Sequence, residues 1–209
     1  GFTLKWYVEL FNDDAIMQSL YNSLLIAILT AVFATILGTF AAIGISNLKG
    51  AKKVVVQNAS NIPIINPEIV TGISMMLLFV FCARLIGVTD ALGFGTMLVA
   101  HVTFNLPYVI LSVMPKLNQL DTHLSEAALD LGCTPIRAFF TVKLPNIMPG
   151  VLSGMVMAFT LSLDDFVISY FVGPSNFQTL PLLIYSMTKK TVKPDMYALS
   201  TLIFITILV

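Results

Sequence analysis

Charged residues are scarce in this sequence. Asp, Glu, Lys and Arg make up only 11% of its 209 residues, whereas a soluble domain has about 25%. Hydrophobic residues account for 57% of the chain, and its mean hydropathy is +0.90. The composition therefore predicts a protein embedded in membrane lipid rather than a soluble domain.

The sequence also lacks net charge and has little cysteine. Eleven Lys and Arg residues balance eleven Asp and Glu residues, so no basic field attracts phosphate groups, and no nucleic-acid partner is predicted. The two cysteines, Cys82 and Cys133, fit neither a disulfide framework nor a metal site with four ligands. No metal site is predicted.

The motifs of common enzymes are missing. There is no G-x-x-x-x-G-K-[ST] loop for ATP and no H-E-x-x-H metal helix, and no catalytic residue is predicted. Asp164 and Asp165 raise the alternative of an intramembrane aspartyl enzyme. However, adjacent helical residues point about 100° apart, whereas a catalytic pair of carboxylates must share a proton. His101, within an apolar run, is predicted to be a hydrogen-bonded packing residue rather than a proton relay.

Long apolar runs predict the membrane helices. Four runs are long enough to cross about 30 Å of hydrocarbon: residues 24–45, 54–84, 91–115 and 150–172. A fifth run, residues 198–209, is too short to cross, and the chain does not begin with Met, so we expect a piece of a longer polypeptide. A short amphipathic helix is predicted over residues 180–188.

Small residues recur along the first run at intervals of three or four positions: Ala27, Ala31, Ala34, Gly38 and Ala42. Such a stripe lets a second helix approach closely. Gly150 and Gly154 form a weaker GxxxG pattern of the same kind. The alternative is that small residues are simply common in membrane helices.

The second run is predicted to be a broken helix. It is too long for one straight crossing and contains Pro63 and Pro67, which remove backbone donors from the helical hydrogen bonds. Glu68 follows the second proline, 18 residues after Gly50, or about 27 Å of helical rise. We therefore expect the Glu68 carboxylate to lie at membrane depth.

Between the third and fourth runs lies a segment rich in charge. Residues 116–143 contain seven charged or histidine side chains, so this segment is predicted to lie in water. We expect a short helix capped by Thr122 or Ser125 and ended at Gly132, then a second short helix with two phenylalanines. Prolines mark the return into the membrane. Two short helices that project from a bilayer predict a docking site for a soluble partner; the alternative is an ordinary loop.

The segment from Glu126 to Pro149 carries the pattern E-A-A-x3-G followed by Phe and Leu-Pro-x3-Pro. This pattern resembles the coupling loop of binding-protein-dependent ABC importer permeases. The segments NPEIVTGISMMLLF, AFTLSLDDFVIS and GPSNFQTLPLLIYSM resemble permeases of the spermidine/putrescine importer family, in particular their C-type subunit. The resemblance extends from Trp6 through nearly the whole chain.

This resemblance implies an all-α integral membrane protein with the MetI-like bundle of ABC importer permeases. Six helices are expected in the family and about five in this chain, the last one cut. Residues 15–209 are identified as an ABC transmembrane type-1 permease domain, which includes a cytoplasmic coupling loop over residues 116–146. Residues 1–14 are expected to form an external segment after a missing first helix.

The resemblance also implies a location and partners. The chain is expected in the inner membrane of a bacterium, in contact with lipid, a homologous second permease subunit, two ATP-binding subunits and an extracytoplasmic polyamine-binding protein. No cofactor is expected in this chain, because ATP and Mg would be bound by the ATPase subunits. Six Lys and Arg residues lie on the coupling-loop side and five on the other, so the resemblance, not charge, assigns the loop to the cytoplasm.

Contacts with an ATP-binding subunit are implied for the coupling loop. Glu126 is expected to make a polar contact and Gly132 to supply the turn, and closure of the ATPase dimer would move the loop as a lever. The full set of expected coupling residues is Glu126, Ala127, Ala128, Gly132, Phe139, Phe140, Leu144 and Pro145.

A substrate pathway is predicted around three carboxylates at membrane depth, those of Glu68, Asp164 and Asp165. Carboxylates at this depth are costly and usually face a cavity or a partner, and a linear polycation would offset the cost. Phe166 and Tyr170 would add cation-π contacts to its ammonium groups. The alternative is a structural role, in which Arg84 or a second permease subunit neutralises the acids.

The predicted function is that of a permease subunit with no enzymatic activity of its own. It would form half of the translocation pathway of an ATP-driven spermidine or putrescine importer. An importer of another small cation is the alternative within the same class.

Overall fold

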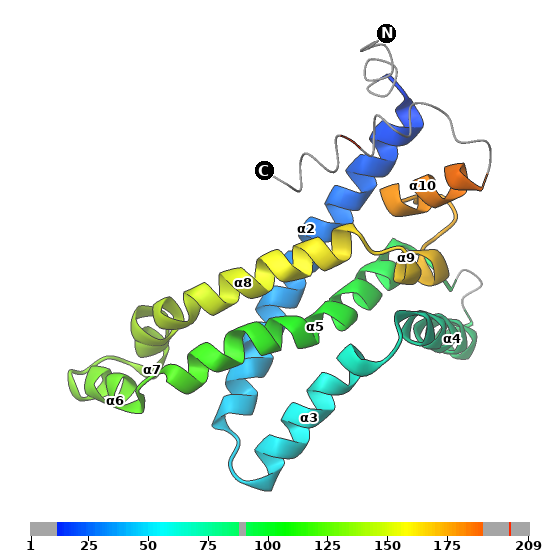
Figure 1. Ribbon diagram of the computed structural model, residues 1–209. Coiled ribbons are helices and arrows are strands. Elements are labelled where there is room, and N and C mark those ends of the chain that lie inside the picture. Colours follow the sequence, from blue (N-terminus) through cyan, green and yellow to red (C-terminus); the bar gives the residue numbers. More distant parts are fainter. Residues whose placement is uncertain (1–11, 88–90, 190–200, 202–209) are drawn as a thin grey trace.

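Figure 1 shows the computed structural model of the chain, which describes residues 12–87, 91–189 and 201. Within these residues every regular element is a helix, so the all-α prediction is confirmed. The elements are α2 (Asp14–Asn47), α3 (Ala51–Ile65), α4 (Glu68–Ile86), α5 (Phe94–Gln119), α6 (Thr122–Asp130), α7 (Pro135–Ala138), the π-helical turn η1 (Phe139–Lys143), α8 (Leu144–Leu163), α9 (Val167–Val172) and α10 (Leu180–Thr188).

Four stretches of helix are long and apolar enough to cross a membrane: Asp14–Asn47, Glu68–Ile86, Phe94–Gln119 and the continuous stretch Pro135–Leu163. Each corresponds to one of the four predicted crossings. The first is longer than predicted, since its 34 residues rise about 51 Å. The predicted external segment 1–14 and the predicted last helix 198–209 lie almost wholly outside the described residues.

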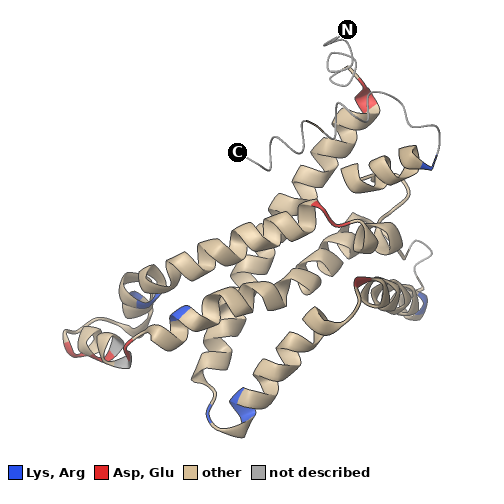
Figure 2. Ribbon diagram, viewed as in Figure 1, with Lys and Arg blue, Asp and Glu red and all other residues tan. Residues whose placement is uncertain are grey.

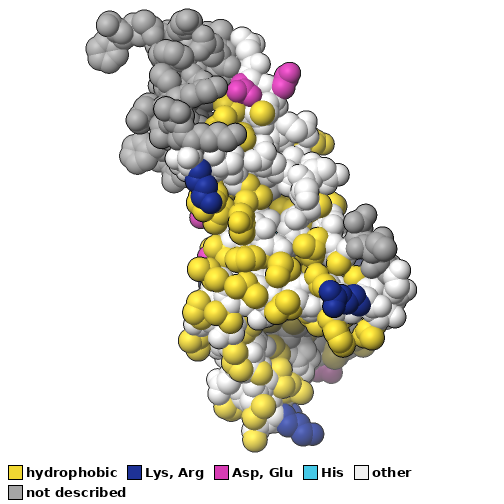
Figure 3. Space-filling view, turned by 90° about the vertical axis from the view of Figure 1, so that its right-hand side faces the viewer, with side chains coloured by type: hydrophobic (Ala, Val, Ile, Leu, Met, Phe, Trp, Pro, Cys, Tyr) yellow, Lys and Arg dark blue, Asp and Glu magenta, His cyan; other side chains and the backbone are white. Residues whose placement is uncertain are grey.

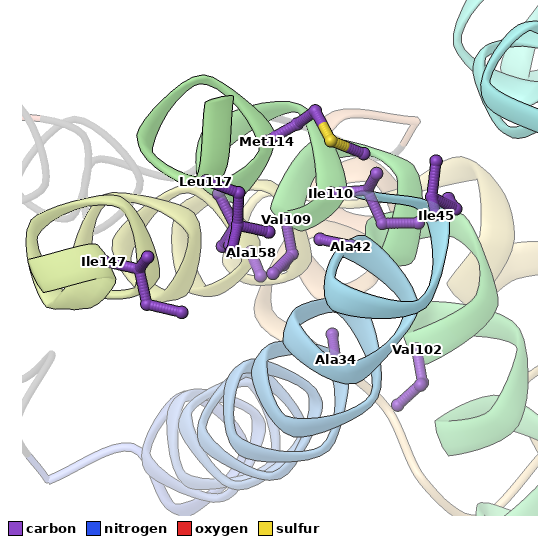
Figure 4. Close-up of a cluster of buried hydrophobic side chains, with 11 residues drawn as sticks. Ala34, Ala42, Ile45, Val102, Val109, Ile110, Met114, Leu117, Ile147 and Ala158 are labelled. Atoms are coloured by element: carbon purple, nitrogen blue, oxygen red, sulfur yellow. The ribbon is translucent and has the colours of Figure 1, made fainter. Parts of the chain in front are cut away.

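The centre of the bundle is the junction of α2, α5 and α8, whose buried side chains form one hydrophobic cluster (Figure 4). All five members of the small-residue stripe on α2 are buried. A Cβ added to Gly38 would lie 2.7 Å from Val109 Cβ, and one added to Gly150 would lie 2.8 Å from the backbone oxygen of Ser112. Because no side chain fits at these distances, α2 and α8 approach α5 at glycine, and the predicted close contacts are confirmed.

The second predicted crossing is broken into α3 and α4, as expected. The break lies at Asn66 and Pro67, where Asn66 has ψ 138°, the extended conformation that a following proline imposes. Pro63 lies inside α3 rather than at the break, so only one of the two prolines interrupts the helix. Glu68 is the first residue of α4, which turns away from the direction of α3 (Figure 1).

The fourth predicted crossing differs from the structure. The prediction of one helix over residues 150–172 is wrong, because the chain is interrupted between α8 and α9. Asp165 lies in the interruption, and its carboxylate accepts hydrogen bonds from the backbone N–H groups of Ile168 and Ser169. A side-chain acceptor thus replaces the helical carbonyls that these N–H groups would otherwise reach, and α9 starts as a separate helix.

The short helices after this break are tied to the rest of the bundle. The amphipathic helix predicted over residues 180–188 is confirmed as α10. Asn22 Nδ2 donates a hydrogen bond to the backbone oxygen of Gln178 (2.9 Å), and Ser23 Oγ accepts one from the backbone N–H of Leu180 (2.7 Å). These bonds join α10 and the preceding loop to α2, while α9 packs against α4.

Large parts of the surface are apolar. The outer face of α2 exposes Ile28, Val32, Phe33, Ile36, Leu37 and Phe40, and α4 buries few of its side chains. Figure 3 shows hydrophobic side chains over most of the face on the α4 side, with few charged groups among them. Such a surface suits contact with lipid or with another membrane subunit.

Candidate functional site

The coupling loop predicted over residues 116–146 folds into α6, α7 and η1, while its first residues belong to the end of α5. The cap of α6 is Asp121, whose side chain accepts a hydrogen bond from the backbone N–H of His123 at 2.9 Å. The prediction of Thr122 or Ser125 as the cap is wrong, because the preceding aspartate already supplies the acceptor that the helix needs.

A glycine turn ends α6, as predicted. Gly132 has φ +85°, a left-handed conformation that favours glycine. Its N–H donates to the Leu129 oxygen at 2.9 Å, and the Cys133 N–H donates to the Ala128 oxygen at 3.1 Å. These two bonds form a Schellman motif, which satisfies the last carbonyls of α6 and turns the chain toward α7.

The second half of the loop is continuous with a membrane helix. From Pro135 the chain runs through α7 and η1 into α8 without a gap, so the predicted short helix that ends before the membrane is wrong. Pro145 has no N–H to donate. Directly before it the helix widens into a π-turn, in which the Leu144 N–H donates to the Phe139 oxygen. The loop is therefore attached rigidly to α8. We call residues 122–143, which comprise α6, α7, η1 and the turn between α6 and α7, the coupling end.

The predicted coupling residues differ in exposure. Ala128 is buried, and Phe139 and Leu144 are half-buried. The other five are exposed: Glu126, Ala127, Gly132, Phe140 and Pro145. Glu126 Oε2 lies 3.1 Å from His123 Nδ1 one turn earlier in α6. Its contact with a partner stays a prediction.

Exposed apolar residues of the coupling end are absent from the predicted set, and the two most exposed of them are Leu131 and Ile136. Leu131 is 87% exposed and Ile136 is 74% exposed, and Phe140 beside them in the sequence is 60% exposed. The sequence does contain a signal for them, since each is an apolar residue in a polar segment beside a helix-ending glycine or a short helix start. Apolar side chains that a fold leaves exposed in this way indicate a contact surface.

Basic side chains gather on the side of the coupling end. Lys and Arg residues occur in the connector between α2 and α3 and in the first turn of α3, near the end of α5, and in α7 and η1. Figure 2 shows these segments at one end of the bundle, with acidic residues of α6 beside them. The connector and the coupling end therefore share a side, as the number of crossings predicts.

The three predicted pathway acids are not equivalent. Glu68 and Asp164 are exposed, at the start of α4 and directly after α8, and Figure 2 shows both sites away from the coupling end. Asp165 is only 8% exposed. Within the described part of the chain neither Glu68 nor Asp164 forms an ion pair, so Arg84 does not neutralise them there.

His101 and Asp165 belong to a buried polar cluster between α5, α8 and α9. His101 is 1% exposed. Its Nδ1 lies 2.8 Å from Ser162 Oγ, and its Nε2 lies 3.1 Å from Ser169 Oγ. The same Nε2 lies 3.5 Å from Asp165 Oδ2. The prediction that His101 is a hydrogen-bonded packing residue is confirmed. Its serine partners were beyond prediction, because the sequence does not indicate which helix a lone serine faces.

Aromatic rings lie around the exposed side of the α8–α9 break. Phe166 and Tyr170, both predicted for the pathway, stack with ring centroids 5.5 Å apart, and Tyr185 of α10 lies 4.6 Å from Phe166. Lys189 Nζ lies 4.6 Å from the centroid of the Tyr185 ring. The cluster thus contacts a primary ammonium group of this chain through a π face. Tyr185 enters the cluster only through the tertiary structure.

Comparison with known proteins supplies the family. Residues 34–209 match the family described as binding-protein-dependent transport system inner membrane component. The putrescine transport system permease protein PotI of Escherichia coli is 42% identical over 206 residues, which cover 97% of this chain and 73% of the relative. The spermidine/putrescine transport system permease protein PotC of Escherichia coli is 39% identical over 209 residues (100% and 77%). PotC of Haemophilus influenzae is 38% identical over 205 residues (98% and 77%). These relatives are named as transport permeases, not as enzymes.

Proposed function

This chain belongs to the family of binding-protein-dependent transport system inner membrane components, and we propose that it is a permease subunit of an ATP-driven polyamine importer. In this role it forms half of the translocation pathway. One observation carries the proposal: a continuous helical stretch, Pro135–Leu163, joins the coupling end to Asp164. Its 29 residues rise about 44 Å, more than the thickness of the hydrocarbon.

The coupling end supplies the contact with an ATP-binding subunit. Leu131 and Ile136 expose apolar side chains there, and burial of one such side chain in a partner's cleft contributes about 1.5–3 kcal/mol. The Schellman turn at Gly132 and the unbroken passage into α8 hold this end rigid. Motion of the ATP-binding subunit is therefore transmitted along α8 rather than absorbed by a flexible loop, and it drives alternating access.

The opposite end of α8 supplies the contact with the cargo. Asp164 and Glu68 are exposed carboxylates without an ion-pair partner among the described residues, and Phe166, Tyr170 and Tyr185 offer aromatic faces. Polyamines are linear chains of ammonium groups joined by methylenes, so carboxylates and aromatic rings both match them. The names of the relatives support putrescine and spermidine as the cargo.

The remaining partners follow from the family. We place the chain in a bacterial inner membrane, where a homologous second permease subunit covers part of its exposed apolar surface and lipid covers the rest. Two ATP-binding subunits hold ATP and Mg, and an extracytoplasmic polyamine-binding protein delivers the cargo. The exposed apolar face of α4 is suited to the second permease subunit.

Reconstitution in proteoliposomes with these partners tests the proposal. The wild-type complex is expected to take up radiolabelled spermidine or putrescine only when ATP is supplied. Ile136→Asp is expected to lower uptake at least about tenfold, because a charge replaces an apolar contact of the partner's cleft. Asp130→Asn, an exposed position at the end of α6, is the control and should retain wild-type uptake. Absence of polyamine uptake in the wild-type complex contradicts the cargo, and full activity of Ile136→Asp contradicts the coupling end.

A further inference from the structure

The α8–α9 break is held by the polar cluster around His101. Both ring nitrogens of this histidine are engaged, Nδ1 with Ser162 Oγ on α8 (2.8 Å) and Nε2 with Ser169 Oγ on α9 (3.1 Å). A single side chain of α5 thus connects the last turn of one helix to the first turns of the next. All three side chains are at most 2% exposed, so water does not compete for these bonds.

Both carboxylate oxygens of Asp165 accept hydrogen bonds within the same cluster. Its Oδ1 accepts from the Ile168 N–H at 3.3 Å, and its Oδ2 accepts from the Ser169 N–H at 2.8 Å. Its Oδ2 also lies 3.5 Å from His101 Nε2. Asp164, the preceding residue, is exposed and makes no ion pair among the described residues. Two adjacent aspartates therefore have opposite surroundings.

From this contrast we infer that His101 and Asp165 are positioning residues for translocation, and that Asp164 is the member of the aspartate pair that meets the cargo. This inference rests on the proposed function and gives the two aspartates of its acidic pathway different roles. His101 and Asp165 keep α9 at an angle to α8, which leaves Asp164 exposed and carries Phe166 and Tyr170 beside Tyr185. No residue of the positioning pair touches the cargo.

The energetic reason is the cost of freeing Asp165. A cargo ammonium that paired with this carboxylate would have to displace two backbone N–H groups, which would then remain buried without acceptors. A buried N–H group left without an acceptor is destabilising, whereas Asp164 is reached without breaking these hydrogen bonds. The ammonium therefore pairs with Asp164, and the charge of Asp165 is stabilised inside the chain by the hydrogen bonds from the first amides of α9.

Substitutions at the two aspartates separate contact from positioning. Asparagine keeps one acceptor oxygen for the Ser169 N–H and gives up the longer bond to the Ile168 N–H (3.3 Å), so Asp165→Asn should keep most of the break, and its uptake per assembled complex should fall by no more than about threefold. Asp165→Ala loses the cap and should fall by about tenfold or more. Asp164→Asn loses the contact and should also fall by about tenfold, with an unchanged melting temperature. We therefore expect asparagine to preserve most of the uptake at position 165 but not at position 164.

Substitutions on α5 test the histidine. His101→Leu removes both hydrogen bonds, whereas His101→Gln retains a donor that reaches toward Ser169. Met97→Ala, on the same helix and also fully buried, is the packing control, because Met97 lies outside the polar cluster. We expect Met97→Ala and His101→Leu both to lower the melting temperature. Only His101→Leu should lower uptake per ATP hydrolysed in complexes that remain assembled, and His101→Gln should restore part of it.

The outcomes distinguish this inference from the proposed function. If the wild-type complex takes up no polyamine, the proposed function fails and the inference fails with it. If the wild-type complex is active but Asp165→Asn falls as far as Asp164→Asn with intact assembly, Asp165 is itself a cargo contact and only the inference is overturned. It is also overturned if His101→Leu and Met97→Ala have the same uptake per ATP.

Discussion

The contact between α5 and α8 depends on the absence of a side chain at position 150, and Gly150→Ala tests it. The added methyl would lie 2.8 Å from the Ser112 backbone oxygen and 2.9 Å from Lys116 Cγ. The lysine side chain can rotate away, but the backbone oxygen cannot, so the two helices must move apart. Overpacking of this kind destabilises the fold by about 1–3 kcal/mol. Alanine offsets part of this loss, because it stabilises a helix by about 1 kcal/mol relative to glycine. The expected net loss is up to about 2 kcal/mol.

Gly44→Ala is the matched control, because Gly44 also lies inside a membrane helix and nothing lies within 4 Å of its added Cβ. This variant should gain about 0.5–1 kcal/mol. For a domain of this size, 1 kcal/mol shifts Tm by about 2–4 °C, so thermal unfolding in detergent, followed by circular dichroism, resolves the two variants. Gly150→Ala should also slow uptake, since α8 carries the motion. A Tm for Gly150→Ala at or above that of Gly44→Ala would refute the close approach of α5 and α8.

Three further substitutions probe the turn, the helix break and the aromatic cluster. Gly132→Val places a branched side chain at φ +85°, which costs about 1–2 kcal/mol; ATP hydrolysed per polyamine imported should rise, and an unchanged ratio would contradict a rigid turn. Pro67→Ala lets the preceding residue become helical, so α3 and α4 should straighten, Glu68 should move, and uptake at equal expression should fall; wild-type uptake would show that the break is dispensable. Tyr185→Leu should slow uptake about two- to fivefold, the value of an exposed cation-π contact, whereas Tyr185→Phe should not; equal losses would implicate the hydroxyl instead of the ring.

Features set by a single residue or by the length of a run follow from the sequence. The four crossings follow from apolar runs long enough for the bilayer. The break before α4 follows from Pro67, which forces Asn66 out of the helix. The turn at Gly132 follows from the left-handed conformation that glycine tolerates. Each of these effects acts within a few residues of its cause, so no knowledge of the neighbouring helices is needed.

The π-turn and the α8–α9 break show where local signals are insufficient. Two prolines near the start of α8 resemble a helix boundary, yet the helix absorbs Pro145 by widening its turn. The run through residues 150–172 looks like one crossing, yet it is interrupted at Asp165. In both cases the course of the helix depends on which hydrogen-bond donors and acceptors the folded chain offers to the backbone. The local sequence pattern does not indicate these partners.

Composition and spacing by themselves therefore determined that this chain is an all-α membrane protein with a charged loop, and they predicted a group of acids within or beside its apolar runs. They could not distinguish Asp164 from Asp165, which are the same residue type at adjacent positions. The tertiary structure distinguishes them, because α5 brings His101 to within 3.5 Å of Asp165 and the first amides of α9 bind the same carboxylate. A buried charge must find partners within the fold. Asp165 finds them and becomes part of the scaffold, while Asp164 keeps its carboxylate free.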